Sequence, residues 1–411
     1  MTQDYADQIE ASKALLKRKI PDLSERFHAE TQRLTLEVAA VKDEMNTGHA
    51  VIEIDYGEII NGAVTPDTID RFKRRGVVVI RNVFDRDKVQ EWNNELHHYI
   101  QSNQYFEKQK EKAGLDSYFG NLASSKPQIF GIYWSRPQME ARQSKELAIT
   151  RQWLNKLWNH PDNNKPEFDA SIECLYADRI RQREPGDASL GLSPHVDGGS
   201  IERWIDPSFY EVYNEVFFGN IDRYDPFNVR GRVHTREIPS PAVCRMFRTY
   251  QGWTALTRQG PGDGTLNVVP IARAMVWVLL RALQHDIDMT DLCGAKAGRA
   301  LGITEKHHNL LLNAYLPIPT VEPGDTVWWH PDVIHGVEDR HLGSEYSNVM
   351  YIGAAPKCAK NENFLKLLRP AFEEGRSSPD FAPEDYETEF SSRFMKEHLS
   401  PLGRVQMGYD T

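Results

Sequence analysis

The sequence predicts a mixed α+β protein with a mainly β core, a double-stranded β-helix (a cupin-like jelly roll) with helices packed around it. Three observations predict this fold. Apolar side chains recur at helical spacing in the first sixty residues, short β-type runs separated by Gly, Pro and Asp fill residues 170–356, and a helical segment follows. We therefore expect an N-terminal helical extension over residues 1–64, the β-helix core with its supporting helices over 65–356, and a C-terminal helical segment over 357–411.

The composition is that of a folded globular protein. Hydrophobic residues make up 40% of the 411 residues and charged residues 26%. The formal net charge of −10 leaves no basic face for binding phosphates, so we expect no nucleic-acid partner. A small-molecule ligand fits this composition better.

Targeting features are also missing from the sequence. The N-terminus is polar and acidic, and no apolar run approaches the ~20 residues that a membrane-spanning helix needs. Four cysteines lack the CxxC spacing of a zinc site and the pattern of a disulfide framework. We expect a cytoplasmic protein with free thiols and no membrane partner.

The first supporting elements are a helix, a strand and a second helix. Thr65 and Pro66 have the pattern of a helix start and Gly76 that of a stop, which predicts a helix over 66–75. The β-branched run 77–80 predicts a buried strand. Asp85 then precedes an amphipathic helix with the apolar residues Val89, Trp92, Leu96 and Tyr99. Residues 106–165 predict no clear element.

The core is predicted from six β-type runs, at residues 174–176, 243–250, 253–256, 265–269, 326–329 and 348–352. A helical interruption is expected near residues 270–284. The apolar spacing of Phe364, Leu368 and Phe372 predicts the C-terminal helix.

Four His-x-Asp/Glu motifs occur, whereas composition alone predicts about two. The motif at His28 lies in a predicted helix, where residues i and i+2 point roughly 200° apart and cannot share a metal. The motif at His160 lies in a turn-rich loop, and His330 stands just before another histidine. His195-Val196-Asp197 follows a β-like run and a turn, so both side chains can project from one strand face.

A third ligand is predicted in the segment from Pro323 to Gly336. A Pro-Gly-Asp turn, a strand rich in β-branched and aromatic residues and a second turn lead to His335. Two histidines and one carboxylate form the facial triad of non-haem Fe(II) sites, although zinc and manganese accept the same ligands. The competing interpretation makes His195 and His335 structural histidines and Asp197 a turn cap.

Four blocks of sequence, taken in order, resemble the phytanoyl-CoA dioxygenase superfamily of 2-oxoglutarate-dependent oxygenases. They are residues 65–96, the motif at His195, residues 252–270 around Trp253, and residues 323–336. Within this superfamily the chain is similar to the YbiU-like family of bacterial and fungal proteins, which shares its overall length. The resemblance implies the β-helix fold, an Fe(II) site formed by His195, Asp197 and His335, and a place for Trp253 near the cosubstrate.

The resemblance also implies an arginine about eleven residues after the distal histidine, which clamps the far carboxylate of 2-oxoglutarate. Here that neighbourhood is Glu345-Tyr346-Ser347-Asn348, with no cation. The last core strand of such folds lies between the first and the third, so Arg181, Arg245 or Arg248 on those strands could replace the missing arginine. The competing interpretation makes each of them a surface residue of a half-exposed strand, so the prediction concerns the group more than any single member.

The function that follows is an Fe(II)- and 2-oxoglutarate-dependent dioxygenase that uses O2 to hydroxylate a small organic substrate. Residues 106–165 and 198–240 could form a lid over its site. The missing arginine motivates an alternative, a cupin-like metal enzyme that does not use 2-oxoglutarate. A second alternative is a non-catalytic metal- or ligand-binding protein. The sequence predicts neither the primary substrate nor the oligomeric state.

Overall fold

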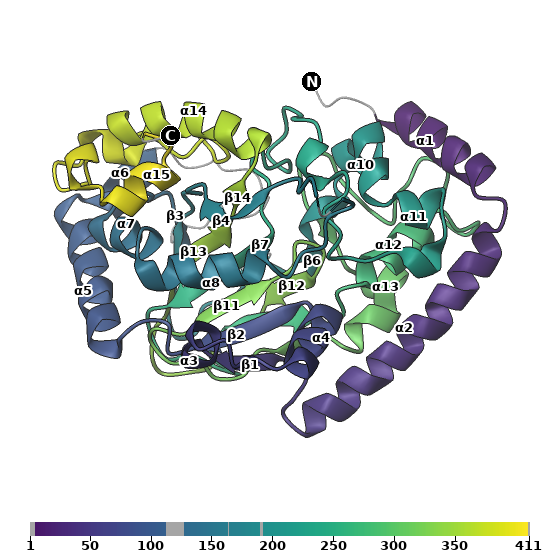
Figure 1. Ribbon diagram of the computed structural model, residues 1–411, viewed down its shortest axis with the longest axis horizontal. Coiled ribbons are helices and arrows are strands. Elements are labelled where there is room, and N and C mark those ends of the chain that lie inside the picture. Colours follow the sequence, from purple (N-terminus) through teal and green to yellow (C-terminus); the bar gives the residue numbers. More distant parts are fainter. Residues whose placement is uncertain (1–4, 112–126, 163, 190–191, 410–411) are drawn as a thin grey trace.

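The computed structural model describes residues 5–111, 127–162, 164–189 and 192–409 as a mixed α+β protein with three β-sheets (Figure 1). The strand order of the first sheet is β1 (Ile52–Asp55), β2 (Val77–Arg81), β11 (Thr326–Trp329), β7 (Tyr250–Ala255), β13 (Ser347–Ala354), β5 (Ile180–Arg183) and β3 (Ile129–Phe130). The second is β10 (Leu316–Pro317), β8 (Leu266–Val269), β12 (Ile334–Val337), β6 (His195–Val196) and β9 (Leu301–Gly302). The third pairs β14 (Pro356–Lys357) with β4 (Asp169–Glu173). The predicted α+β class is confirmed.

Helices flank the strands on two sides in Figure 1. One group is α5 (Arg86–Ser102), α6 (Tyr105–Glu111), α7 (Arg136–Arg142), α14 (Ala359–Glu374) and α15 (Pro401–Gln406). The other is α1 (Ala6–Lys19), α2 (Leu23–Asn46), α10 (Pro207–Val212), α11 (Asn214–Phe217), α12 (Ala274–Arg281) and α13 (Glu305–Leu312). The remaining helices are α3 (Tyr56–Ile60), α4 (Pro66–Arg75), α8 (Lys145–Asn155) and α9 (Ile201–Trp204). No described helix has the length and apolar character needed to cross a bilayer.

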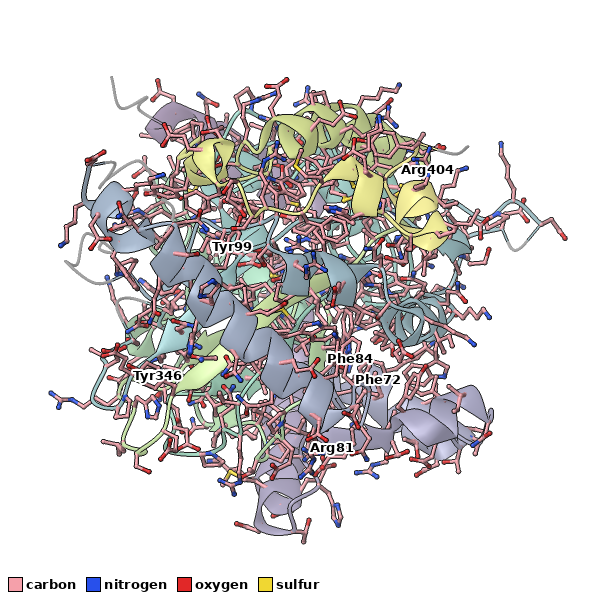
Figure 2. All side chains as sticks on the ribbon, turned by 90° about the vertical axis from the view of Figure 1, so that its left-hand side faces the viewer. Phe72, Arg81, Phe84, Tyr99, Tyr346 and Arg404 are labelled. Atoms are coloured by element: carbon pink, nitrogen blue, oxygen red, sulfur yellow. The ribbon has the colours of Figure 1, made fainter. Side chains whose placement is uncertain are left out.

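The predicted helix–strand–helix start is confirmed. The Thr65 hydroxyl accepts a hydrogen bond from the Thr68 backbone at 3.2 Å, and α4 ends at Gly76 in the left-handed conformation. β2 lies between β1 and β11 and is buried, because its β-branched side chains fill both faces of a central strand. Tyr99 lies on α5 (Figure 2). Its hydroxyl donates a 2.7 Å hydrogen bond to Glu387, which ties this helix to the C-terminal segment.

Two of the predicted β-type runs are not strands. Residues 174–176 follow the end of β4, and the backbone of Cys174 and Leu175 donates to Ala355 and Gln406 instead of a ladder partner. Most of residues 243–250 is irregular, and only Tyr250 belongs to β7. Side chains satisfy its backbone, since Asp380 accepts from the Arg245 amide and Asn361 from the Phe247 amide. The strand prediction was therefore wrong for the segment that carries Arg245 and Arg248.

The N-terminal region contains one strand that helical periodicity could not predict. β1 follows α2 and pairs in parallel with β2, placing Ile52 beside Val78 and Ile54 beside Ile80. The helix α2 itself packs against the core through Leu34 and its apolar neighbours. The first sixty residues thus extend both the helical layer and the larger sheet.

Candidate metal centre

His195, Asp197 and His335 meet at one point of the smaller sheet. β6 and β12 run antiparallel with His195 directly opposite His335, and their ring centroids are 4.4 Å apart. Asp197 leaves β6 in a short 3-10 turn (Asp197–Gly199), so it does not extend the strand as predicted. One ligand atom from each residue lies within 4.8 Å of the others, and His195 Nε2 is 3.5 Å from Asp197 Oδ1.

Backbone carbonyls orient both imidazole rings. His195 Nδ1 lies 2.8 Å from the carbonyl oxygen of Ser193, and His335 Nδ1 lies 3.0 Å from that of Val333. A carbonyl only accepts, so each Nδ1 carries the proton and donates it. Each Nε2 therefore offers its lone pair to the centre, as in metal sites whose histidines are held from behind.

Gln251 orients the carboxylate from the opposite sheet. Its side-chain amide on β7 donates a 2.6 Å hydrogen bond to Asp197 Oδ2. The second oxygen, Oδ1, then faces His195. Sequence analysis missed Gln251, although it lies two residues before Trp253 on a strand and so shares its face.

The charges of the three groups suit a divalent cation. Burial would raise the pKa of Asp197, but the His195 hydrogen bond, the neighbouring histidines and Gln251 lower it below its usual range. Burial and the neighbouring His195 lower the pKa of His335 to about 4, so this imidazole is neutral. Asp197 raises the pKa of His195 although burial opposes this. A bound divalent cation would compete with protons for these ligand atoms.

A cavity of about 550 Å³ opens beside the three residues. Leu266 and Val337 line it from the smaller sheet, while Arg181, Trp253 and Tyr351 line it from the larger one. The centre therefore lies between the two sheets, with room for ligands beside it. Trp253 is buried, and whether it contacts a cosubstrate stays a prediction.

Arg181 carries a buried cation on the wall of this cavity. It stands on β5 opposite Val349 of β13, and only 4% of it is exposed. Its Nη2 donates a long 3.3 Å hydrogen bond to the Gly264 carbonyl, and its Nε has no hydrogen-bond partner within the described part of the chain. A buried guanidinium with unused donors favours an anionic ligand.

The neighbouring Arg183 is occupied by the fold. It lies opposite Ser347, at the start of the last core strand, where the superfamily resemblance places its arginine. Arg183 donates to the carbonyls of Gly264, Glu338 and Asp187 at 2.8–2.9 Å. These bonds hold loops together and leave Arg181 as the better-placed cation for a cosubstrate.

The other two predicted arginines lie before β7. The guanidinium of Arg248 stacks over the Tyr176 ring at 4.7 Å, and Arg245 lies near Asp380. Both arginines line the large cavity. The structure thus brings all seven predicted site residues to one cavity, with Arg245 and Arg248 coming from an irregular segment.

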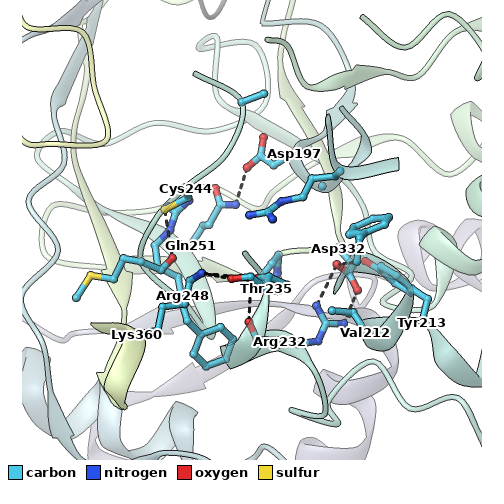
Figure 3. A pocket seen from close by; sticks show the side chains of 17 residues that line it. Asp197, Val212, Tyr213, Arg232, Thr235, Cys244, Arg248, Gln251, Asp332 and Lys360 are labelled. Atoms are coloured by element: carbon cyan, nitrogen blue, oxygen red, sulfur yellow. Dashed lines mark hydrogen bonds and ion pairs between the residues drawn. The ribbon is translucent and has the colours of Figure 1, made fainter. Parts of the chain in front are cut away.

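A second cavity of about 150 Å³ lies behind Asp197 (Figure 3). The Arg232 guanidinium forms a buried 2.7 Å ion pair with Asp332 on its wall. This pair involves the carboxylate of the motif at His330, whose ring stacks on Trp158 5.1 Å away. That motif therefore serves packing.

The aromatic residues of the 198–240 insert pack in the core, namely Trp204, Phe209, Tyr210, Tyr213 and Phe217. Phe209 and Tyr213 also line the smaller cavity. Ile129 brings the 106–165 segment to the large cavity. Residues 112–126 and 163 of the predicted lid lie outside the described residues.

The comparisons with known proteins cover nearly the whole chain. The Gig2-like family model matches residues 3–409. The protein YbiU of Escherichia coli (strain K12) is 39% identical over 410 residues, 99% of this chain and 97% of YbiU. This confirms the predicted resemblance to the YbiU-like family.

Two solved structures are similar along their whole length. A Salmonella typhimurium LT2 protein proposed to be an oxidoreductase is 38% identical, with a TM-score of 0.93 over 99% of this chain and 98% of its own. The Candida albicans protein GlcNAc Inducible Gene 2 is 26% identical, with a TM-score of 0.80 over 100% of this chain and 91% of its own. The fold is thus shared between bacterial and fungal proteins.

Proposed function

The chain belongs to the Gig2-like family, and from this premise we propose that it is a non-haem Fe(II)- and 2-oxoglutarate-dependent oxygenase that hydroxylates a small organic substrate. One observation carries the proposal. Two imidazole Nε2 atoms and one carboxylate oxygen converge beside a cavity of about 550 Å³. Its similarity to the Salmonella protein proposed to be an oxidoreductase supports the reaction class.

The two larger sheets, in this proposal, are the halves of a double-stranded β-helix. The strands taken as its core are β5, β6, β7, β8, β10, β11, β12 and β13. Along the chain they alternate between the two sheets, except that β8 and β10 share one. Such alternation winds two sheets around a common cavity, as in a jelly roll. The strand order supports the fold that the sequence resemblance implies.

The three ligands occupy one face of the metal and leave positions for reactants. His195 and His335 would bind through Nε2 and Asp197 through Oδ1. When bound, Fe(II) with 2-oxoglutarate supplies the oxidising chemistry, using O2. The protein holds the ligands in place from behind through Ser193, Val333 and Gln251.

Arg181 is the residue proposed to bind the far carboxylate of 2-oxoglutarate. It stands on β5 next to the last core strand, so it reaches the same cavity wall as the arginine that the superfamily resemblance implies. Its unused donors can form charge-assisted hydrogen bonds with both carboxylate oxygens. Trp253 and Tyr351 bury the space beside it and limit access of water.

An anaerobic titration tests this function. The protein is loaded with Fe(II), 2-oxoglutarate is added while visible absorbance is recorded, and succinate is measured after O2 is admitted. We expect a metal-to-2-oxoglutarate charge-transfer band and slow succinate release without any primary substrate. His335→Ala should lose the iron and the band, whereas the matched change His285→Ala, at an exposed histidine, should keep both.

The other outcomes separate the alternatives. Iron binding without any response to 2-oxoglutarate would support a metal enzyme that does not use this cosubstrate. A wild-type protein that binds neither would contradict the oxygenase and favour a non-catalytic role.

A further inference from the structure

Arg248 lies at the boundary of the two cavities. It lines both of them together with Asp197 and Gln251 (Figure 3). Its guanidinium stacks over the Tyr176 ring at 4.7 Å. A Cβ added to Gly353 of β13 would lie 3.2 Å from Arg248 Cδ, so the absence of a side chain at Gly353 makes room for the arginine. The cation is thus preorganised beside the metal centre.

Within the described ranges, the half-buried guanidinium of Arg248 makes no ion pair and donates no hydrogen bond. At longer range it interacts electrostatically with the carboxylates of Asp178, Asp197 and Asp380. Arg232 in the smaller cavity differs, because Asp332 neutralises it at 2.7 Å. An unpaired cation inside a site indicates an anionic ligand.

The charges around the large cavity lead to the same conclusion. Among the described residues, its lining contains four arginines and three carboxylates: Arg179, Arg181, Arg245, Arg248, Asp178, Asp197 and Asp380. Bound Fe(II) and 2-oxoglutarate cancel each other's two charges. One positive charge then remains without a counterion, which a singly charged anion would balance.

Aromatic and aliphatic side chains form part of the cavity wall near Arg248, alongside the carboxylates of Asp178 and Asp380. Tyr176 packs against Phe381 with ring centroids 6.1 Å apart, and Pro379, Pro383 and Ile238 also line the cavity. A ligand whose anionic group meets Arg248 would therefore lie against aromatic and aliphatic surfaces.

We propose that Arg248 binds the anionic group, a carboxylate or a phosphate, of a primary substrate whose apolar body packs against Tyr176 and Phe381. The identity of this ligand as a substrate rests on the proposed function. Arg181 and Arg248 then have separate partners, the cosubstrate and the substrate. This division explains why one cavity contains more than one arginine without a fixed carboxylate.

Three small probes test the proposal: phenylacetate, its neutral isostere phenylacetamide, and phenyl phosphate. Binding to the anaerobic Fe(II)-loaded protein is measured by calorimetry with 2-oxoglutarate at saturation, so that the cosubstrate site is filled. We expect the wild type to bind at least one anion about tenfold or more tightly than the amide. The two anions distinguish a carboxylate from a phosphate ligand.

Arg248→Met should remove this preference and Arg248→Lys should retain part of it. Arg258→Met, at an exposed arginine paired with Glu322, should leave the preference unchanged. Equal binding of the three probes to the wild type, no binding of any of them, or an undiminished preference in Arg248→Met overturns the proposal. Circular dichroism checks that each variant is folded.

The charge-transfer band tests the proposed oxygenase function independently of the anion preference. A band without any anion preference refutes only the role of Arg248. An anion preference that depends on Arg248, without a band, supports the anion site while the oxygenase fails.

Discussion

At the scale of single residues, Gln251 decides which oxygen of Asp197 faces the two histidines. Its 2.6 Å hydrogen bond restrains Oδ2 and leaves Oδ1 directed at the centre. Gln251→Ala should weaken metal binding about 10- to 100-fold, as losses of such orienting partners do in metal sites. Anaerobic titration with Fe(II) measures the change. Gln90→Ala, on the exposed face of α5, is the matched control, and equal affinities in both variants would refute the role of Gln251.

Arg181 is the second residue whose role can be measured directly. Arg181→Met removes charge-assisted hydrogen bonds and should raise the Kd for 2-oxoglutarate roughly 10- to 100-fold while iron still binds. The charge-transfer band, followed as 2-oxoglutarate is added, gives this Kd. Arg258→Met should leave the Kd unchanged. An unaltered Kd in Arg181→Met would show that another cation binds 2-oxoglutarate.

At the scale of elements, the end of α4 packs behind the strand that carries His335. Gly76 has φ +71°, and a Cβ there would lie 2.7 Å from Val333 Cγ2 and 3.0 Å from Ala272 Cβ. The carbonyl of Val333 accepts the bond that orients His335. A change at Gly76 is therefore expected to disturb packing next to the metal centre.

The matched pair Gly76→Ala and Gly62→Ala separates backbone strain from packing. Both glycines have positive φ, but a Cβ at Gly62 meets nothing within 4 Å. Gly62→Ala should cost about 1 kcal/mol of unfolding free energy, and Gly76→Ala should cost about 1–3 kcal/mol more through overpacking. Urea denaturation measures both values. Similar losses in the two variants would show that packing at Gly76 is not tight.

At the scale of the whole molecule, one buried polar network joins the 198–240 insert to the β-core. Asp332 accepts hydrogen bonds from Arg232 at 2.7 Å and from the Tyr213 hydroxyl at 2.9 Å. Beside it, His330 Nδ1 accepts from the Asp332 backbone amide, so its Nε2 donates to the Pro226 carbonyl at 2.9 Å. The ring must therefore be neutral, because a second proton would break the bond to Asp332.

This network makes stability depend on pH. Burial lowers the pKa of His330 from 6.5 to about 4. As pH falls, His330 is therefore protonated in the unfolded chain before it is protonated in the folded protein. The stabilisation that neutral His330 contributes is complete above pH 6.5 and is lost as pH falls towards 4. The unfolding free energy should drop by up to about 3 kcal/mol through this histidine.

Urea denaturation between pH 4 and 8 measures this effect. In His330→Gln the acid-induced drop should be smaller, even though the variant is less stable at neutral pH. His285→Gln, at an exposed position, should keep the wild-type slope. A slope that is the same in all three proteins would contradict the linkage to His330.

Local patterns predicted much of the element order. The Thr65 cap, the Gly76 stop and the β-branched run of β2 are decided by neighbours in sequence, and the structure agrees with them. β1 and the irregular segment around Arg248 were not predictable in this way. β1 is a short strand whose backbone hydrogen bonds in the sheet are made with β2. In the irregular segment before β7, the side chains of Asp380 and Asn361 accept the backbone hydrogen bonds.

The site shows the same division. Motif spacing pointed to His195, Asp197 and His335, because each lies at a strand or turn that local pattern can predict. Gln251 belongs to no motif, and its role arises only because β7 of one sheet faces β6 of the other. The partners of Arg181, Arg183 and Arg248 likewise depend on loops distant in sequence.

The sequence by itself determined which side chains are candidate metal ligands and roughly where many strands and helices begin. Tertiary structure alone decided which arginine is bound by carbonyls, which arginines line the cavity beside the candidate metal centre, and which oxygen of Asp197 faces His195. The physical reason is the distance along the sequence over which each interaction acts. Capping and strand propensity act over a few residues, whereas burial and ion pairing depend on segments that meet only when the two sheets pack together.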